Sequence, residues 1–378
     1  MAEARAGTVL QLLGPSTGGI RRHVAALVDG LGAQGWTARV AGPAGVMDGI
    51  GPQDAVVPVP SGLDPRKVLR ARRALQGLTV GGTSDVDVDV VHAHGLKAGL
   101  LASTIKGARP LVVTVHNLVL DEAAGRSAAV LRRLEARLPR RVDRLIAVSP
   151  QIAERFDGLP GSDRVVVVPP VVDAPQVRRS RAGVRAALGV AADAPLVVCV
   201  ARLHPQKDLP TFVRALDQVR ATVPEVRAVV VGSGPDEAAL RILVTELGLD
   251  GTVSFLGQSP NAADEMAAGD VVVVSSLWES GPLVVVEAME LGRPVVSTPV
   301  GFVPQLVDDG VSGRLVPIGD AAALGDAVAG LLPDPGAAQA LGRAGQEAVR
   351  TRFDRGRLVA DVAAVYDEVR SGVMEGAR

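Results

Sequence analysis

The chain has few aromatic residues and a single cysteine. Phe, Trp and Tyr make up 2% of its 378 residues, so few side chains could serve as flat stacking platforms for a ligand. Cys199 lies within an apolar strand pattern, and a lone cysteine cannot form an intrachain disulfide. We therefore interpret it as a core thiol of a protein in a reducing compartment.

Long apolar runs and a strong charge of one sign are also missing. No uninterrupted run approaches the length of a membrane span, and the N-terminus leads into a strand pattern without the apolar segment of a signal peptide. The formal net charge of -1 gives no electrostatic reason to expect a nucleic-acid partner. We expect a cytoplasmic protein without a transmembrane segment.

Short apolar runs alternate with longer amphipathic segments along the whole chain. This alternation predicts βα units and mainly parallel sheets. Amphipathic helices are expected at 19–31, 65–75, 128–138, 150–156 and 352–370, and a surface loop at 77–83. Strands are expected at 8–13, 37–41, 88–91, 111–115, 145–148, 165–168, 196–200, 228–231, 253–256, 271–274 and 295–297.

The length of the chain allows two domains, each with its own core. Pro169-Pro170 ends the first series of βα units, and the polar, Arg-rich segment after it predicts an interdomain linker. We expect a first domain at 1–172, a linker at 173–193, a second domain at 194–350 and a C-terminal helix at 351–378. Both domains should be Rossmann-like, with the carboxyl ends of their strands pointing into a cleft.

Two glutamates with seven residues between them, Glu279 and Glu287, flank a predicted loop-to-helix junction that Gly281-Pro282 opens. The first backbone amides of a helix have no partner within it, so such a junction is a ready anion site. Two carboxylates beside an anion site favour a ligand with both phosphates and hydroxyls, such as a nucleotide sugar. Taken singly, each glutamate could equally be a helix-end or surface carboxylate.

Two cations, Arg202 and Lys207, share the loop that follows the strand expected at 196–200. The chain has only four lysines among many arginines, a bias typical of bacterial genes rich in G and C. A departing nucleoside diphosphate gains negative charge, which arginine can hold bidentately and lysine as a point charge. The simpler alternative is that Lys207 is a solvated loop cation.

In combination, these motifs resemble those of the family 4 retaining glycosyltransferases of the GT-B fold. They occur in family order over nearly the whole chain: Gly18-Gly19, Thr-Val-His-Asn ending in His116-Asn117, Arg202 with Lys207, and Glu279 with Glu287. The resemblance implies an α/β protein of two Rossmann-like domains with parallel sheets facing a central cleft. The first domain would lie on the acceptor side, the second would bind the nucleotide sugar, and the C-terminal helix would return to the first domain.

The resemblance also implies an activity. A sugar would move with retention, and without a metal or other cofactor, from a UDP- or GDP-type donor to an unidentified acceptor hydroxyl. Glu287 would bind the ribose hydroxyls and Glu279 those of the donor sugar. Catalytic roles fall on His116, Arg202, Lys207 and Glu279. Donor-binding roles fall on Gly18, Gly19, Gly232, Gly234, Ser280, Gly281, Pro282, Leu283 and Glu287.

Two patterns invite a metal interpretation. His92 and His94, at i and i+2, would share one side of a continuing strand, but no further cysteine or histidine cluster supports a metal, and positioning or acceptor-side roles are favoured. Asp85, Asp87 and Asp89 resemble the metal-binding aspartates of another glycosyltransferase fold, but they alternate with valines and are interpreted as a polar strand edge. We predict no metal site.

Several alternatives remain open at this point. The glycines at 14–19 and 232–234 could form tight turns instead of allowing a ligand to approach the backbone. The basic stretch 132–141 could contact an anionic membrane surface, although a solvated helix face is favoured. A catalytically silent protein that binds a nucleotide sugar is one alternative function. An NAD-dependent oxidoreductase is another, which the missing Gly-x-Gly-x-x-Gly fingerprint argues against.

Overall fold

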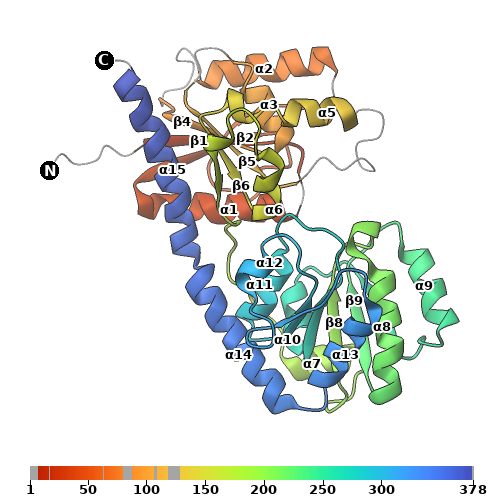
Figure 1. Cartoon of the computed structure of the whole chain (residues 1–378). Coiled ribbons are helices and arrows are strands. Elements are labelled where there is room, and N and C mark those ends of the chain that lie inside the picture. The colour runs from red at the N-terminus through yellow and green to blue at the C-terminus, as the bar shows by residue number, and fades with distance from the viewer. Residues whose placement is uncertain are drawn as a thin grey trace. The chain divides into compact units, whose positions relative to one another are not determined.

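The computed structural model describes residues 7–376 except 17, 63, 80–86, 106–108 and 118–127. The chain divides into two compact units, one of residues 1–173 and 355–378 and the other of residues 174–354. Each unit has helices packed around its own sheet (Figure 1). The segment expected as a linker, 173–193, includes helix α7 (Arg181–Ala187), which belongs to the second unit.

The first unit contains a seven-stranded sheet in the order β3-β2-β1-β4-β5-β6-β7, with parallel pairing throughout. Its strands β4 and β5 are buried along their whole length, as expected for parallel strands covered on both faces. The elements are β1 (Gly7–Leu13), α1 (Gly19–Leu31), β2 (Trp36–Gly42), β3 (Gln53–Val56), α2 (Pro65–Thr79), β4 (Val90–His94), α3 (Leu96–Ala102), β5 (Leu111–Val115), α5 (Ala128–Glu135), β6 (Arg144–Ala147), α6 (Pro150–Ala153), β7 (Val165–Val167) and α15 (Arg355–Gly376).

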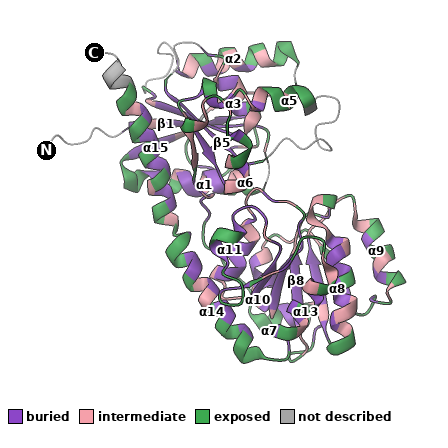
Figure 2. Ribbon diagram, in the orientation of Figure 1, coloured by how far each residue is buried: buried purple, intermediate pink, exposed green. Residues whose placement is uncertain are grey.

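The second unit contains a six-stranded parallel sheet in the order β10-β9-β8-β11-β12-β13. Valines dominate its central strands, and the buried residues of this sheet form one core with those of the helices that cover it (Figure 2). After α7 the elements are β8 (Leu196–Val200), α8 (Leu209–Thr222), β9 (Arg227–Val231), α9 (Glu237–Glu246), β10 (Val253–Gly257), α10 (Ala262–Ala268), β11 (Val271–Val274), α11 (Leu283–Glu290), β12 (Val295–Ser297), α12 (Val303–Leu306), β13 (Arg314–Leu315), α13 (Ala321–Leu331) and α14 (Pro335–Arg352).

Three differences from the predicted elements have physical reasons. The strand expected at 88–91 is β4, which continues to His94 because its last residues pair with β1, His92 opposite Gln11 and His94 opposite Leu13. The prediction of a loop at 77–83 is wrong for residues 77–79, because they complete α2. Residues 80–83 lie outside the described part of the chain. Strands β3 and β13 were not predicted, because neither carries a continuous apolar run.

The helix expected at 352–370 starts three residues later in the structure, as α15. Helix α14 ends at Arg352, and α15 starts at Arg355 and packs against α1 and β4 of the first unit (Figure 1). Its start is fixed by charge, because Arg355 pairs with Asp29 at 2.7 Å and with Asp173 at 3.0 Å. Helix α15 therefore completes the core of the unit in which the chain begins.

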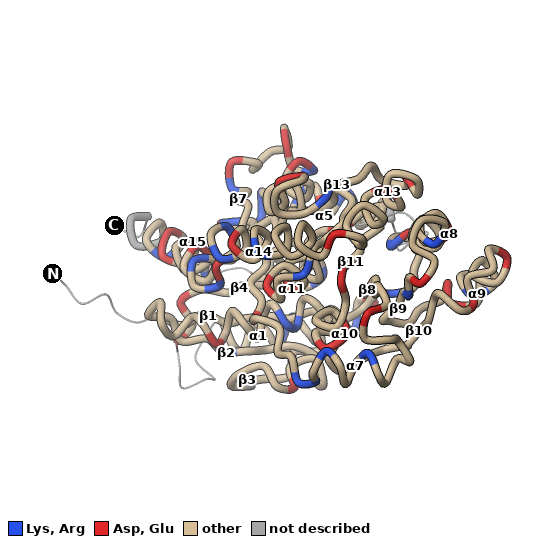
Figure 3. The backbone as a smooth tube through the Cα atoms, turned by 90° about the horizontal axis from the view of Figure 1, so that it is seen from below, with Lys and Arg blue, Asp and Glu red and all other residues tan. Residues whose placement is uncertain are grey.

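Charged residues of both signs are interspersed along the chain, as Figure 3 shows for Lys and Arg beside Asp and Glu. Many of these charges form local pairs, among them Arg241 with Glu237 at 2.8 Å along one face of α9. A search of the described helices finds none that is both long and apolar enough to cross a membrane.

The contact between α1 and α15 leads to a stability prediction. A Cβ added at Gly30 of α1 would lie 2.8 Å from a methyl carbon of Val359, whereas one added at Gly32 would meet no described atom within 4 Å. We expect Gly30→Ala to lower the free energy of unfolding by about 1–3 kcal/mol through overpacking. Gly32→Ala should be neutral or stabilise by about 0.5–1 kcal/mol.

Urea unfolding of both variants in a Trp278→Phe background, followed by the fluorescence of Trp36 in the first unit, provides the measurement. Val359→Ala added to Gly30→Ala should recover part of the loss, because it removes the clashing methyl groups. Equal effects of Gly30→Ala and Gly32→Ala would contradict the tight contact.

Candidate active site

Both sheets reverse their strand order beside the strand that comes first in the sequence. In the second unit β8 lies between β9 and β11, and in the first unit β1 lies between β2 and β4. At such a switch point, the loops that leave the carboxyl ends of neighbouring strands diverge and leave a crevice for a ligand. Arg202 and Lys207 follow β8, Glu279 follows β11, Gly18 follows β1 and His116 follows β5.

Hydrogen bonds tie the loop after β8 to the loop after β11. The backbone N–H of Leu277 donates to the carbonyl of Gln206 at 2.9 Å. The hydroxyl of Ser275 donates to the carbonyl of Lys207 at 2.9 Å. These bonds hold Lys207 next to the loop that carries Glu279.

The side chains of Lys207 and Glu279 form an ion pair through Nζ and Oε1. Their exposed fractions are 15% and 10%, so water screens this pair less than a surface pair. The hydroxyl of Ser276 donates to the same Oε1 at 3.0 Å. Ser276 was not predicted from the sequence, although a hydroxyl two residues after the apolar β11, at the carboxyl edge of the sheet, is a usable signal.

The second glutamate lies in α11. This helix starts at Leu283, directly after Gly281-Pro282, and Glu287 on its second turn is buried. The turn before the helix is held tightly, because a Cβ on Gly301 would lie 3.0 Å from the carbonyl oxygen of Ser280. The N-terminal amides of α11 and both glutamates thus occupy one short stretch of chain.

The glycines after β9 have a structural reason that sequence analysis did not find. A Cβ on Gly232 would lie 1.9 Å from the carbonyl oxygen of Ala201, and one on Gly234 would lie 2.1 Å from that of Leu203. The N–H of Leu203 also donates to the carbonyl of Ser233 at 3.1 Å. The two loops therefore pack backbone to backbone, which already requires glycine, and the role of these glycines in donor binding stays a prediction.

The loop after β8 is a compact turn that ends in a strained residue. The N–H of His204 donates to the carbonyl of Arg202 at 2.9 Å, and the N–H of Lys207 donates to that of His204 at 2.8 Å. Asp208 has a φ of 45°, a left-handed conformation that is uncommon outside glycine. The guanidinium of Arg202 is exposed, and no ion pair joins it to another residue of the described part.

In the first unit, the glycine pair opens α1. Gly18 is the N-cap with φ 63° and ψ −121°, and Gly19 is the first residue of the helix. No described atom lies within 4 Å of a Cβ built on Gly18, so its backbone conformation, not a close neighbour, favours glycine. A donor-binding role for both glycines stays a prediction.

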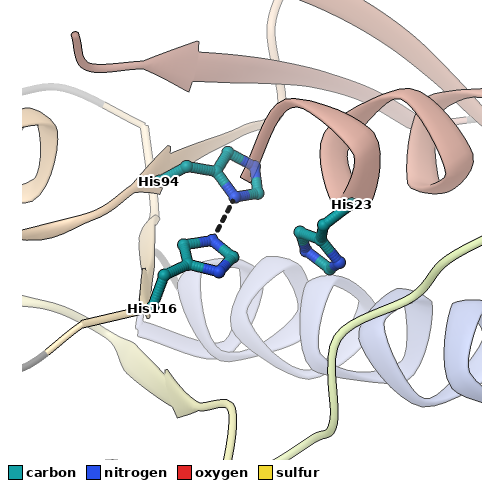
Figure 4. A group of neighbouring side chains, drawn as sticks. All are labelled: His23, His94 and His116. Carbon is teal, nitrogen blue, oxygen red and sulfur yellow. Dashed lines mark hydrogen bonds between the residues drawn. The ribbon is translucent and has the colours of Figure 1, made fainter. Parts of the chain in front are cut away.

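Four histidines gather behind this loop, each at most 6% exposed. His92 and His94 lie on β4, His116 directly follows β5, and His23 comes from α1; Figure 4 shows His23, His94 and His116 facing one another. A ring nitrogen of His94 (Nδ1) lies 3.2 Å from Nε2 of His116. The structure thus joins His94 to the predicted His116 and adds His23, which lies inside the amphipathic helix α1 and not at the end of a strand.

Two further residues complete this cluster, and sequence analysis missed both. Nε2 of His94 lies 2.7 Å from Oε1 of Gln11 on β1, and Nε2 of Gln11 lies 3.1 Å from the hydroxyl of Tyr366 on α15. The same hydroxyl lies 2.6 Å from Nδ1 of His92. The available signals were a single glutamine in the apolar β1 and the only tyrosine of the chain.

Burial keeps the four imidazoles neutral. Desolvation lowers the pKa of His23 from 6.5 to about 4, although its hydrogen bond with the backbone of Val171 opposes the shift. Desolvation, reinforced by the neighbouring imidazoles, also lowers the pKa values of His92, His94 and His116 well below 6.5.

Among the described residues, His23, His94 and His116 form the one group whose side chains come close enough to be considered for a metal. Their candidate ligand nitrogens lie within 4.8 Å of one another. A tetrahedral zinc ion with Zn–N bonds of about 2.0–2.1 Å requires nitrogens about 3.4 Å apart. Coordination would also break the hydrogen bond between His94 and His116, so we interpret the group as a hydrogen-bonded cluster.

Two other predicted patterns lie away from these residues. Asp89 accepts a hydrogen bond from the N–H of Thr8 at 2.7 Å and Asp87 pairs with Arg109, so both make contacts at the amino ends of neighbouring strands, while Asp85 lies outside the described residues. Within the basic stretch 132–141 and at its end, Arg137, Arg140 and Arg141 line a hollow of about 360 Å³. These arginines precede β6 and therefore lie at the amino edge of the sheet, opposite the carboxyl edge that bears His116.

Comparison with known proteins identifies the family. The sequence model described as "Glycosyltransferase Family 4" matches residues 17–175, and that described as "Glycosyl transferases group 1" matches residues 181–348. A D-inositol 3-phosphate glycosyltransferase of Mycobacterium avium is 36% identical over 68% of this chain and 64% of its own length. That of Saccharomonospora viridis is 34% identical over 74% of this chain and 70% of its own length. The chain therefore belongs to the family 4 glycosyltransferases, and a bacterial origin fits these relatives.

Solved structures agree on the fold. A crystal structure of Anabaena Alr3699/HepE in complex with UDP and glucose has a TM-score of 0.80 and 24% identity, covering 96% of this chain and 100% of that one. Sucrose-phosphate synthase from Thermosynechococcus elongatus has a TM-score of 0.79 and 24% identity, covering 97% and 100%. The predicted GT-B class, with two Rossmann-like domains built on parallel sheets, is confirmed.

The buried histidines predict a dependence of stability on pH. Unfolded histidine titrates near 6.5, whereas His23 in the folded protein titrates near 4, so the unfolded state binds more protons between these values. The contribution of neutral His23 to the free energy of unfolding is therefore complete above pH 6.5 and is lost as the pH falls toward 4. The expected slope is about 1.4 kcal/mol per pH unit for each such histidine.

Urea unfolding at pH 7.5, 6.5, 5.5 and 4.5 measures this slope. Trp278→Phe leaves Trp36 as the only tryptophan, so fluorescence then reports on the first unit. His23→Gln should reduce the slope by the contribution of one histidine, about 1.4 kcal/mol per pH unit. His204→Asn in the second unit should leave the slope unchanged. A stability that does not change from pH 7.5 to 4.5 would contradict the neutral cluster.

Proposed function

We propose that this chain is a retaining, metal-independent glycosyltransferase that moves a sugar from a nucleoside diphosphate sugar to an acceptor hydroxyl. The observation that carries the proposal is the paired Lys207 and Glu279 at the switch point of the second sheet, beside the N-terminus of α11. That stretch offers a cation for a diphosphate and a carboxylate for sugar hydroxyls. Membership of the glycosyltransferase family supports the same reading.

The chemistry requires charge stabilisation at the leaving group. The bond between the anomeric carbon and the diphosphate oxygen breaks, and a bond to the acceptor oxygen forms on the same face of the sugar. The acceptor proton passes to the leaving phosphate. Negative charge grows on the diphosphate as its bond lengthens, and the fixed positive charges of Arg202 and Lys207 stabilise it most strongly at that stage.

The carboxylates and His116 would hold the rest of the donor. Glu287, a turn inside α11, would accept hydrogen bonds from the ribose hydroxyls, and Glu279 from the hydroxyls of the sugar. The backbone amides at Gly281 and Leu283 would assist. His116 would hydrogen-bond the donor sugar and stabilise developing positive charge through its backbone carbonyl.

The comparisons suggest the first substrates to test. UDP-sugars come first, because the Anabaena structure contains UDP and glucose, and inositol phosphates are the first acceptors, because the relatives are named for one. Release of UDP or GDP from a panel of donors, with NMR of the product anomer, tests the proposal. An inverted anomer would overturn retention, and nucleotide-sugar binding without turnover would favour the silent alternative.

Lys207→Ala should lower kcat by roughly two orders of magnitude or more, the usual cost of deleting one electrostatic stabiliser. Lys207→Arg should recover only part of the rate, because a planar fork cannot reproduce a point charge. Steady-state kinetics on the active donor measure both effects. A change confined to KM would mean that Lys207 binds the ground state only.

Because Lys207 and Glu279 are paired, their effects should not be independent. The double variant Lys207→Ala/Glu279→Ala should lose less activity than the product of the two single losses, because each single change leaves one charge without its partner.

Turnover should persist in EDTA. If chelation abolishes activity and magnesium or manganese restores it, the metal-free mechanism is wrong.

Variants of the two glutamates should differ in the ligand whose binding they weaken. Glu287→Ala should weaken binding of the bare nucleotide by about 1.5–3 kcal/mol, the range for hydrogen bonds to a charged acceptor. Glu279→Ala should cost more with the full sugar donor than with the nucleotide alone. Calorimetry with UDP and with UDP-glucose measures both differences, and equal losses of affinity for the two ligands in Glu279→Ala would mean that the roles are misassigned.

A further inference from the structure

A continuous line of hydrogen bonds runs from the last helix of the chain to His116. The hydroxyl of Tyr366 on α15 contacts Gln11 on β1 at 3.1 Å. Gln11 contacts His94 at 2.7 Å, and His94 contacts His116 at 3.2 Å. All four side chains are buried, so water does not compete for these bonds.

The chemistry of Gln11 gives this line a direction. Its Oε1 can only accept, so Nε2 of His94 carries a proton and donates it. A neutral imidazole holds one ring proton, which leaves Nδ1 of His94 as an acceptor. Nε2 of His116 must then be the donor in the contact between the two rings.

The position of this proton defines what His116 can offer a ligand. With its single proton on Nε2, its Nδ1 has a free lone pair. No hydrogen bond to Nδ1 occurs within the part of the chain that the structure describes. The ring would therefore face a ligand as a hydrogen-bond acceptor, which suits the hydroxyl of a sugar and not the oxygen of a phosphate.

Tyr366 supports the orientation of the Gln11 amide that the structure shows. Nε2 of Gln11 donates to its hydroxyl, and that hydroxyl can pass its own proton to Nδ1 of His92 at 2.6 Å. Nε2 of His92 then donates to the hydroxyl of Thr114 at 2.6 Å. If the amide oxygen and nitrogen of Gln11 exchanged places, each donor in this line of hydrogen bonds would become an acceptor. His116 would then carry its proton on Nδ1.

We propose that Tyr366, Gln11 and His94 are positioning residues that hold His116 in its Nε2-protonated form, so that it meets a hydroxyl of the donor sugar as an acceptor. The contact with the sugar rests on the proposed function, but the protonation pattern does not. It is a property of the first unit without any ligand.

Nitrogen-15 NMR of histidine-labelled protein tests the pattern. The chain has only five histidines, so two-bond proton–nitrogen correlations can identify the protonated nitrogen of each ring, with His116 assigned from His116→Gln. We expect the proton of His116 on Nε2 in the ligand-free wild-type protein. Finding it on Nδ1 would overturn the proposal, and this measurement depends on no positioning variant.

Two variants then test the positioning residues. Tyr366→Phe keeps the ring that packs against Trp36 but removes the hydroxyl, and Gln11→Met keeps the length of the side chain but removes both of its hydrogen bonds. Each should convert the spectrum of His116 to a mixture of both protonation forms. Thr79→Val is the matched control, because Thr79 carries a buried hydroxyl in the same unit, and this hydroxyl donates to the carbonyl of Leu75 within α2. An unchanged His116 spectrum in Tyr366→Phe would overturn the role of Tyr366.

Ligand titration separates this proposal from the proposed function. UDP-glucose should shift the resonance of Nδ1 of His116 in the direction expected for an accepted hydrogen bond, and UDP alone should not. A shift of equal size with both ligands would overturn the contact with the sugar. Failure of UDP-glucose to bind would count against the proposed donor while leaving the protonation result in place.

Discussion

At each buried, neutral imidazole, the hydrogen bond made by one ring nitrogen decides which of the two nitrogens carries the proton. The first unit places four imidazoles in one core, so this constraint applies four times in a small volume. Each proton assigned to one ring limits the next, which is why Gln11 and Tyr366 matter to a residue they do not touch. The position of His94 on β4 follows from the same requirement, because its partners lie on the neighbouring β1 and directly after β5.

In the second unit, the loops that carry charged residues are held in place without being deeply buried. Contacts between their backbones hold them. Gly232 and Gly234 let the loop after β9 lie directly against the loop after β8, and Leu277 bonds that loop from the other side. Lys207 is thus fixed by its backbone before its amine meets Glu279. A cation held this way loses little conformational entropy when it binds a diphosphate, because its loop is already ordered.

Local patterns predicted most of the strands and drew attention to the residues of the charged pair. Strands such as 111–115 and 271–274 have the expected bounds, because continuous apolar runs between turn residues leave little choice. The resemblance to the family implied that Lys207 and Glu279 serve one site, and the strands before them do lie side by side in one parallel sheet. The finding that they pair with each other, and that Ser276 supports them, required coordinates.

Contacts between distant parts of the sequence could not be predicted. Gln11 and Tyr366 are 355 residues apart, and neither lies in a motif. The reason for Gly232 was also hidden, since a glycine after a strand fits ligand approach and backbone packing equally well. The short β3 lacks an apolar run, so only its neighbour β2 reveals it as a strand.

The return of the chain to the first unit explains how one tyrosine near the C-terminus can complete a network that begins at residue 11. The chain leaves the first unit at Asp173 and re-enters it at Arg355, and these two side chains form an ion pair at 3.0 Å. The whole second unit is therefore an insertion whose two ends are adjacent. Once that unit has folded, its ends are already close, so docking α15 costs far less chain entropy than closing an unfolded loop of the same length. The core of the first unit and the protonation of its histidines can thus both depend on a helix made last.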